Sequence, residues 1–537
     1  MKYIECDDRM QLILFPERLD DLVSGNNPVR FIDAFVAQLD LEEIGFKKTD
    51  LVKELAGRPC YSPECLLKLY VYGYFKKVRS SRKLMEMCNI NIEVMWLIGR
   101  LTPDFRTISD FRKDNAGVIK DVFKRFVKTC VDLGLYNTEV GVQDGSKFRA
   151  VNSKDNNMTE AKLQKKQEIV EEKINEYLEE LDKYDAEESD SQKHTKEEIE
   201  AKIEILKARK EQYNAIQNEM KEEGVTQKSF TDPDSRLMKT ANGGYDVCYN
   251  AQIFVDPTSH LIGGFDVTSN CNDLGLLSPM TTEVKEDLDV KIIEVVADKG
   301  YEDKADMLDC IMNGTIPHIP SKSGKESYEF EVDYKETEIT EAQINSTAPE
   351  AIKACLEAGV LPNVYKDKGI EVSVHEEEKY ERDETSELHF IRNEEGTSVI
   401  CPNGSNLNKV ATLHKKEKTR YASKSACKVC TDKCTTSKFK QVDLKYEQTL
   451  LYATKPQREK RVVKRVFIRI TPNKGKILNR KSVVEHPFGT IKRWMDGSYL
   501  LLKGKTKVCA ELALSFLAYN IKRVITMLGV SALIEKL

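Results

Sequence analysis

The chain has 537 residues, of which 40% are hydrophobic and 32% are charged. This length exceeds one ordinary hydrophobic core and predicts three or four domains, at roughly 100–200 residues each. No run of 18 apolar residues occurs, and the start lacks a basic segment followed by an apolar one, so we expect neither a membrane span nor a signal peptide. Fourteen cysteines, mostly scattered singly, favour a reducing cytoplasm over a disulfide framework.

The net charge of -5 hides an uneven distribution along the chain. Residues 159–225 carry 20 Asp/Glu against 12 Lys/Arg, and residues 324–398 carry 20 against 8. Residues 399–537 carry 30 Lys/Arg against 9 Asp/Glu, a net charge of +21. A basic region of this size predicts contact with DNA or RNA, and a solvated basic surface is the alternative.

Residues 1–135 are predicted to form an all-helical domain. Ser62 is a candidate N-cap and Pro63 suits the first position of a helix over 62–78. Apolar residues over 115–135 recur at helical spacing and end at Gly134. The basic residues of this region either contact DNA or are solvated on a plain helical scaffold; they are Arg79, Arg82, Lys83, Arg106, Arg112 and Lys113.

Residues 136–320 and 472–537 are predicted to form an α/β core. Its elements are strands over 138–151, 245–256, 261–269 and up to Asp298, with helices over 274–288, 302–314, 476–495 and 510–528. Residues 159–225, rich in Glu and Lys with sparse apolar residues at helical spacing, predict an inserted coiled-coil-like hairpin that is either solvated or dimerising. Residues 321–471 form a second insertion, with an acidic segment followed by a basic lobe that contains a cysteine cluster.

Three acids are candidates for metal binding. Asp144 lies in a strand before Gly145, where a phosphate could approach the backbone, and Asp298 ends a second strand of the same predicted sheet. Mg²⁺ prefers oxygen ligands, and Glu485 is the candidate for a third carboxylate. Glu485 and Lys492 are spaced i, i+7, which predicts that both face one side of a helix that Pro487 kinks or restarts. The alternatives are turn-capping aspartates and a solvent-facing Glu–Lys helix.

The chain resembles the DDE transposases of bacterial insertion sequences, in the branch with an N-terminal helical domain. The resemblance covers most of the chain and rests on several blocks in order. They are "GRPCYSPECLLKLYVYGY", "LTPDFRTISDFRKDN", "VQDGSKFRA", "TDPDSRLMKT", "SNCNDLGLLSPM", "VVADKGYED" and "RKSVVEHPFGTIKR". A related signature has Tyr and Arg seven and four residues before the Glu, where this chain has Leu478 and Lys481, while Lys492 matches.

The resemblance implies an RNase H-like sheet flanked by helices, with Asp144, Asp298 and Glu485 as catalytic ligands of Mg²⁺ or Mn²⁺, two ions in all. It also implies cleavage at the terminal inverted repeats of the element, followed by joining of the 3′-hydroxyl ends to target DNA. We expect a homodimer that is located in the cytoplasm and associated with the nucleoid. The residues expected to contact DNA are Arg480, Lys481, Lys492 and Arg493. Alternatives are an RNase H-like nuclease without strand transfer, and a catalytically retired DNA-binding protein.

Four cysteines in the basic region have the pattern C-x25-C-x2-C-x3-C. They are Cys401, Cys427, Cys430 and Cys434. Four thiolates with a CxxC pair are typical of a tetrahedral structural Zn²⁺ site, although the isolated first cysteine departs from a standard zinc ribbon. The alternative is a set of reduced cysteines packed in a small lobe.

Overall fold

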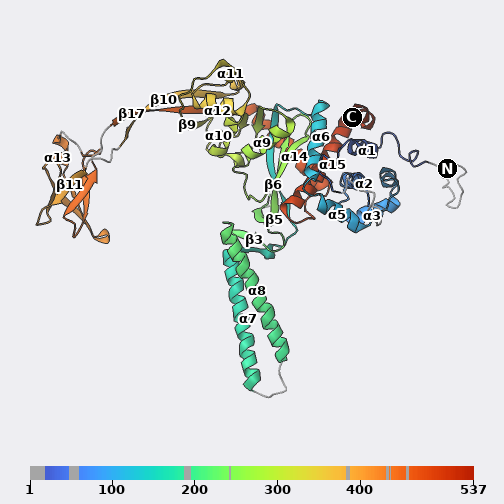
Figure 1. Cartoon of the computed structure of the whole chain (residues 1–537), viewed down its shortest axis with the longest axis horizontal. Coiled ribbons are helices and arrows are strands. Elements are labelled where there is room, and N and C mark those ends of the chain that lie inside the picture. The colour runs from blue at the N-terminus through green and yellow to red at the C-terminus, as the bar shows by residue number, and fades with distance from the viewer. Residues whose placement is uncertain are drawn as a thin grey trace, which may run out of the picture.

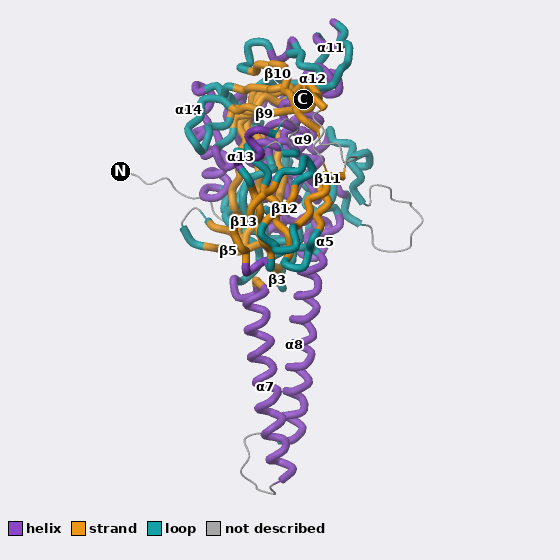
Figure 2. The backbone as a smooth tube through the Cα atoms, turned by 90° about the vertical axis from the view of Figure 1, so that its left-hand side faces the viewer, coloured by secondary structure: helices purple, strands orange, loops and turns teal. Residues whose placement is uncertain are grey.

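The computed structural model of the chain describes residues 18–47, 60–186, 195–240, 243–381, 387–430, 434–435, 437–454 and 459–537. The start of the predicted helical domain and residues 187–194 of the predicted hairpin lie outside these residues. A body of helices and strands carries two projections, a pair of long helices and a strand-rich lobe (Figures 1 and 2). Among the described helices none is by itself long and apolar enough to cross a membrane.

The N-terminal part of the described chain is helical. Its helices are α1 (Pro28–Ala37), α2 (Pro63–Phe75), α3 (Ser81–Ile90), α4 (Ile92–Leu97), α5 (Phe105–Asp114) and α6 (Ile119–Asp132). The Ser62 hydroxyl accepts the N–H of Glu64, so α2 begins at the capping signal in the sequence. Both α2 and α6 pack against the C-terminal helix α15 (Lys505–Leu528), and the two ends of the chain share one hydrophobic core.

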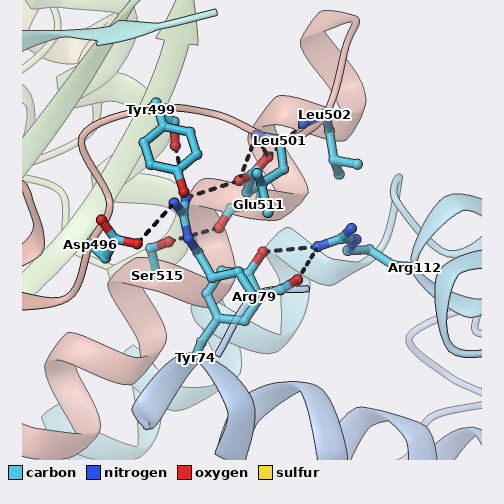
Figure 3. Close-up of polar contacts among 9 residues, drawn as sticks. All are labelled: Tyr74, Arg79, Arg112, Asp496, Tyr499, Leu501, Leu502, Glu511 and Ser515. Carbon is cyan, nitrogen blue, oxygen red and sulfur yellow. Dashed lines mark hydrogen bonds and ion pairs between the residues drawn. The ribbon is translucent and has the colours of Figure 1, made fainter. Parts of the chain in front are cut away.

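A buried polar network joins these helices to the rest of the body (Figure 3). The Arg79 guanidinium, 6% exposed, donates to the carbonyl of Tyr499 at 2.8 Å and to the Glu511 carboxylate at 3.2 Å. Glu511 also accepts the backbone N–H of Leu501. Arg112 donates to the Tyr74 hydroxyl at 3.2 Å. Arg79 and Arg112 are therefore buried and make hydrogen bonds inside the protein. The DNA-contact candidates that remain in this region are exposed: Arg82, Lys83, Arg106 and Lys113.

The central sheet contains both parallel and antiparallel strand pairs. Its strand order is β4–β5–β1–β7–β8, and β6 pairs with β5 beside this path. β1 runs antiparallel to β5 and parallel to β7, which is parallel to β8. The strands are β1 (Val140–Arg149), β4 (Arg236–Lys239), β5 (Tyr245–Val255), β6 (Ile262–Thr268), β7 (Ile293–Val296) and β8 (Thr315–His318). β7 thus has a parallel neighbour on each side, which explains its nearly continuous apolar sequence.

Helices flank this sheet. They are α9 (Leu277–Leu288), α10 (Lys304–Met312), α14 (Lys474–Gly489) with a π-helical turn (Thr490–Trp494), and α15. The last helix, α16 (Val530–Lys536), packs on α1 and α15. α9 packs on β5, β6 and β7, whereas α14 packs on β1 and β7. The first turn of α14 is tied to β7 because Lys476 pairs with the buried carboxylate of Glu294, which also contacts His318 at 2.7 Å and Lys368 at 2.7 Å.

The helical hairpin consists of α7 (Glu160–Ala186) and α8 (Lys196–Glu222) and projects from the body in Figure 2. A short ladder of β2 (Asn157–Thr159) with β3 (Gln227–Ser229) closes its base. Its own small core comprises Met158, Leu163, Val170, Tyr213 and Met220.

A three-stranded sheet of order β10–β17–β9 connects the body to the strand-rich lobe. Its strands are β9 (Tyr328–Asp333), β10 (Ile370–Glu381) and β17 (Glu459–Ile470), and α11 (Glu341–Ile344) and α12 (Pro349–Glu357) lie between β9 and β10. The acidic β10 pairs antiparallel with the basic β17, so that Glu371 lies opposite Arg469 and Glu376 pairs with Lys464 at 3.5 Å. Charges that are far apart in the sequence therefore face one another here.

The strand-rich lobe comprises residues 387–454 and has a sheet of order β15–β14–β13–β12–β11–β16. Its elements are β11 (Glu387–Arg392), β12 (Ser398–Ile400), β13 (Asn406–Leu413), β14 (Lys418–Ala422), α13 (Lys424–Val429), β15 (Gln441–Lys445) and β16 (Leu450–Thr454). Short 3-10 turns occur at Lys154–Asn156, Lys299–Tyr301, Asn363–Tyr365 and His414–Lys416. Figure 1 shows the lobe at the far end of β10 and β17.

Candidate active site

Asp144 and Asp298 lie on neighbouring parallel strands. The register pairs Val142 of β1 with Val296 of β7, and each aspartate follows two residues later. Asp298 caps the 3-10 turn that follows β7, where its Oδ1 accepts the N–H of Gly300 at 2.6 Å. Side chains opposite each other on parallel strands share a face. The two carboxylates predicted from the sequence therefore meet at one edge of the sheet.

The pKa of Asp144 depends on its burial and on the charged side chains around it. Burial raises it to about 6, Arg480 opposes the rise, and the neighbouring carboxylates of Asp298 and Asp273 add to it. The Arg480 guanidinium, from α14, lies 3.5 Å from Asp144 Oδ2. A second cation close to Asp144 would stabilise the ionised form, which is the form that binds a metal ion.

Asp273 is a third acid near this pair, and the sequence analysis did not select it. It lies in the loop between β6 and α9, where Asn250 and Gln252 each donate to its Oδ1 at 2.8 Å. The Tyr301 hydroxyl donates in turn to Gln252 Oε1. The only signal in the sequence is an acid just before a helix, "SNCNDLG", a context that most often marks a cap or a turn.

The alternation of β1 side chains separates Asp273 from Asp144. A Cβ on Gly145 would lie 2.3 Å from Gln252 Nε2 and 2.6 Å from Asp273 Oδ1. Asp144 instead contacts Arg480 of α14, so α14 covers one face of β1 and Asp273 packs on the other. The space at Gly145, interpreted from the sequence as room for a phosphate, is occupied by these polar side chains.

Glu485 lies on α14, the helix that covers the Asp144 face. Its side chain is 64% exposed and pairs with Lys481 at 3.6 Å. Among the described residues no group of three or more His, Cys, Asp or Glu side chains is arranged to hold a metal ion. The structure thus brings Asp144 and Asp298 together and places Glu485 on the adjoining helix with its carboxylate directed to solvent.

Pro487 lies inside α14, so the helix does not restart there, although a restart was one of the two outcomes predicted for this residue. The helix continues to Gly489, and a π-helical turn follows it. A helical proline leaves the carbonyl four residues earlier without its usual N–H donor. Here that carbonyl belongs to Val483, and His260 Nδ1 lies 3.4 Å from it. This contact from the loop after β5 removes the need for a break at Pro487.

The four predicted DNA-contact residues have different surroundings. Lys492 donates to Ser146 Oγ at 2.6 Å and to the carbonyl of Lys147 at 2.7 Å, and burial lowers its pKa to about 8. Arg480 is largely buried beside Asp144, whereas Lys481 and Arg493 are exposed. The π-helical turn changes the rotation per residue, so Lys492 and Glu485 do not share the environment that i, i+7 spacing predicts.

The acidic edge fits a divalent cation by the chemistry of its donors. Asp144 and Asp298 offer oxygen ligands, the type that Mg²⁺ and Mn²⁺ prefer. The pKa of Asp144 is raised, chiefly by burial, so a bound cation would offset the cost of its ionised form. The cysteines lie elsewhere: Cys401, Cys427, Cys430 and Cys434 line one cavity of the strand-rich lobe.

Comparison with known families gives two matches within the chain. Residues 17–114 match the family described as transposase domain (DUF772), and residues 400–525 match the family described as transposase DDE domain. The first range contains α1 to α5, and the second contains the cysteine cluster and Glu485. No match was found among curated proteins or among solved structures. Use of divalent metal ions is general among DDE transposases. Together, the two matches support a DDE transposase of an insertion sequence.

Proposed function

We propose that this transposase binds the terminal inverted repeats of its own insertion sequence, cleaves the DNA ends by metal-dependent hydrolysis and joins the resulting 3′-hydroxyls to target DNA. The observation that carries the proposal is the position of Asp144 and Asp298 on adjacent parallel strands, under a helix that supplies both Glu485 and basic side chains. The mixed sheet flanked by helices is compatible with an RNase H-like core for this chemistry.

The proposed ligand set is Asp144, Asp298 and Glu485. Glu485 is assigned to it because α14 covers the face on which Asp144 lies, and because Glu485 falls between Arg480 and Lys492, which both contact that face. Mg²⁺ or Mn²⁺, as a pair of ions held by these carboxylates, would activate water and stabilise the leaving 3′ oxygen. To join this set, the Glu485 side chain gives up its ion pair with Lys481 and turns toward the metal ions. Loss of that pair costs little because exposed ion pairs are weak.

The basic residues of this edge have separate proposed roles. Arg480 offsets the charge of Asp144 before the cation arrives. Lys481 and Arg493 are exposed and contact DNA phosphates, which contributes affinity without reading sequence. Lys492 is held against β1 by Ser146 and the backbone, so it offers a fixed positive charge close to the scissile phosphate.

The experiment is a cleavage and strand-transfer assay on DNA that carries the sequence flanking the coding region, with Mg²⁺ supplied. We expect Asp144→Asn, Asp298→Asn and Glu485→Gln to abolish both cleavage and joining while gel-shift affinity for the DNA survives. Asp309→Asn, which removes an exposed carboxylate of α10, is the matched control and should retain full activity.

Three outcomes contradict parts of this proposal. Normal cleavage by any one of the three active-site variants removes that residue from the ligand set. Cut ends without joined product, from the unaltered protein, favour a nuclease without strand transfer. DNA binding with no cutting under any divalent ion favours the catalytically retired DNA-binding protein.

A further inference from the structure

Four cysteines from separate segments line one small cavity in the strand-rich lobe. Cys401 follows β12, Cys427 lies in α13, Cys430 is the C-cap residue of that helix, and Cys434 comes four residues later. The cavity has a volume of about 20 Å³. That volume holds one water-sized or ion-sized occupant and excludes any organic cofactor.

The chemistry of the cavity lining selects among ions. Sulfur is the ligand atom that all four cysteines offer, and the described residues that line the cavity include no His, Asp or Glu. Four thiolates in tetrahedral reach are typical of structural Zn²⁺, whereas Mg²⁺ and Ca²⁺ require oxygen. Lys438 and Lys440 also line the cavity, and their charges offset the net negative charge of a zinc ion bound by four thiolates.

Two N–H groups already point at the sulfur atoms. The side-chain amide of Asn403 donates to Cys430 Sγ at 3.1 Å, and the backbone N–H of Lys440 donates to Cys427 Sγ at 3.4 Å. Hydrogen bonds of this kind orient ligand side chains and stabilise the thiolate form around a metal ion. Cysteines that only fill space in an apolar core do not require N–H donors at their sulfur atoms.

The hydrophobic core of the lobe is small. Among the described residues it contains six buried apolar side chains: Phe390, Val399, Leu407, Tyr421, Val442 and Leu444. Cys401, Cys427 and Cys434 pack partly buried against this core. A unit of this size rarely folds on apolar burial alone and commonly needs a metal ion or a disulfide. A cross-link at the cysteines would tie α13 to the β12–β13 turn and to the segment that leads into β15.

We propose that Cys401, Cys427, Cys430 and Cys434 bind one structural Zn²⁺ ion that holds the strand-rich lobe together. The described thiols line the cavity without being closed to ligand distances, so binding draws them inward. Four Zn–S bonds form, the four thiol protons pass to solvent, and no oxidation or reduction takes place. The proposal is independent of the acidic edge, because the thiols and the candidate active-site carboxylates lie on different elements.

The test measures metal content and ligand type on the full-length chain. Protein prepared with zinc supplied and then freed of loosely bound metal should contain one zinc per chain by elemental analysis. Titration of Co²⁺ into zinc-free protein should give the intense near-ultraviolet absorption of thiolate–cobalt charge transfer. Cys430→Ser should lower the zinc content at least severalfold, whereas Cys60→Ser, which alters an exposed cysteine in the N-terminal region, should leave it unchanged.

Hydrogen exchange keeps the test valid when a lobe variant folds poorly. Removal of zinc from the unaltered protein by a chelator should raise exchange in residues 387–454 and leave α7 and α8 unchanged. Absence of zinc from the unaltered protein, equal zinc in the Cys430→Ser variant, or cobalt spectra without thiolate bands would each overturn the proposal. A disulfide among the four cysteines, detected by mass spectrometry of unreduced protein, would also overturn it. If the unaltered protein binds zinc but does not cleave DNA, that result contradicts the proposed function and leaves the zinc proposal intact.

Discussion

The buried Arg79 provides a sharp test of how the N-terminal helices are joined to the rest of the body. Arg79→Met keeps much of the side-chain volume but removes the hydrogen bonds to the carbonyl of Tyr499 and to Glu511. Removal of one partner from a buried ion pair costs about 3–5 kcal/mol. The side chains of Arg79 and Glu511 are 6% and 1% exposed, so solvent screening reduces this value little. We expect a loss of that size in the free energy of unfolding.

The pH dependence of this loss tests its electrostatic origin. Burial raises the pKa of Glu511, and loss of the Arg79 charge raises it further. An acid whose pKa is raised by folding costs stability above that pKa, and the cost disappears as the pH falls through it. The penalty of Arg79→Met should therefore be larger at pH 8 than at pH 5. Loss of packing alone would give the same penalty at both values.

The assay is urea unfolding followed by tryptophan fluorescence. Both tryptophans lie near the joined parts: Trp96 is in α4, and Trp494 precedes the loop that carries Tyr499. Arg82→Met is the matched control, because Arg82 is exposed and should change the unfolding free energy by about 0.5 kcal/mol or less. Equal behaviour of the two variants, or a penalty independent of pH, would refute the reasoning.

Three further predictions concern the acidic edge and the basic surface. Asp273→Asn removes a charge that raises the pKa of Asp144, so the acidic limb of the cleavage–pH profile should move to lower pH while cleavage persists. Lys492 loses its charge as the pH rises through about 8, so DNA affinity should fall between pH 7 and 9, and Lys492→Arg should flatten that fall in a fluorescence anisotropy titration. Arg493→Gln should reduce the slope of log affinity against log salt by about one, whereas Arg469→Gln, opposite an acid in β10, should leave it unchanged.

The sequence predicts strand ends here better than it predicts side-chain environments. Apolar runs ending in Asp144 and Asp298 were sufficient to place two carboxylates on one sheet, because the period of a buried strand is visible locally. The role of Arg79 was not visible, since its partners Tyr499 and Glu511 lie more than 400 residues later. Arg112 donates to the Tyr74 hydroxyl of another helix, a contact that helical periodicity alone does not predict. Asp273 escaped selection for the same reason: its amide donors come from a strand, and the local sequence indicates only a turn.

Helix α14 illustrates a second limit of local reasoning. Pro487 predicts a kink from its missing N–H, but the resulting free carbonyl has a partner in His260, which is 223 residues from Val483 in the sequence. A π-helical turn follows Gly489 and places Lys492 against Ser146. Helical spacing alone could not predict this position, because the rotation per residue changes between Glu485 and Lys492.

Residues 399–537 have a net charge of +21, but part of this positive charge is neutralised by nearby acids in the folded protein. That sum includes β17, whose basic residues lie beside the acidic β10 and close to β9, where Arg465 pairs with Asp333. These positive charges are partly neutralised within the protein and release few counterions when DNA binds. The basic charge outside β17 lies on α14 with its π-helical turn, on residues 503–537, and on the strand-rich lobe, where 12 Lys/Arg stand against 7 Asp/Glu. The first of these surfaces adjoins Asp144 and Asp298. Under the proposed function, we therefore expect DNA to bind at this edge rather than along β17, because β10 neutralises the basic strand that would otherwise compete for the same phosphates.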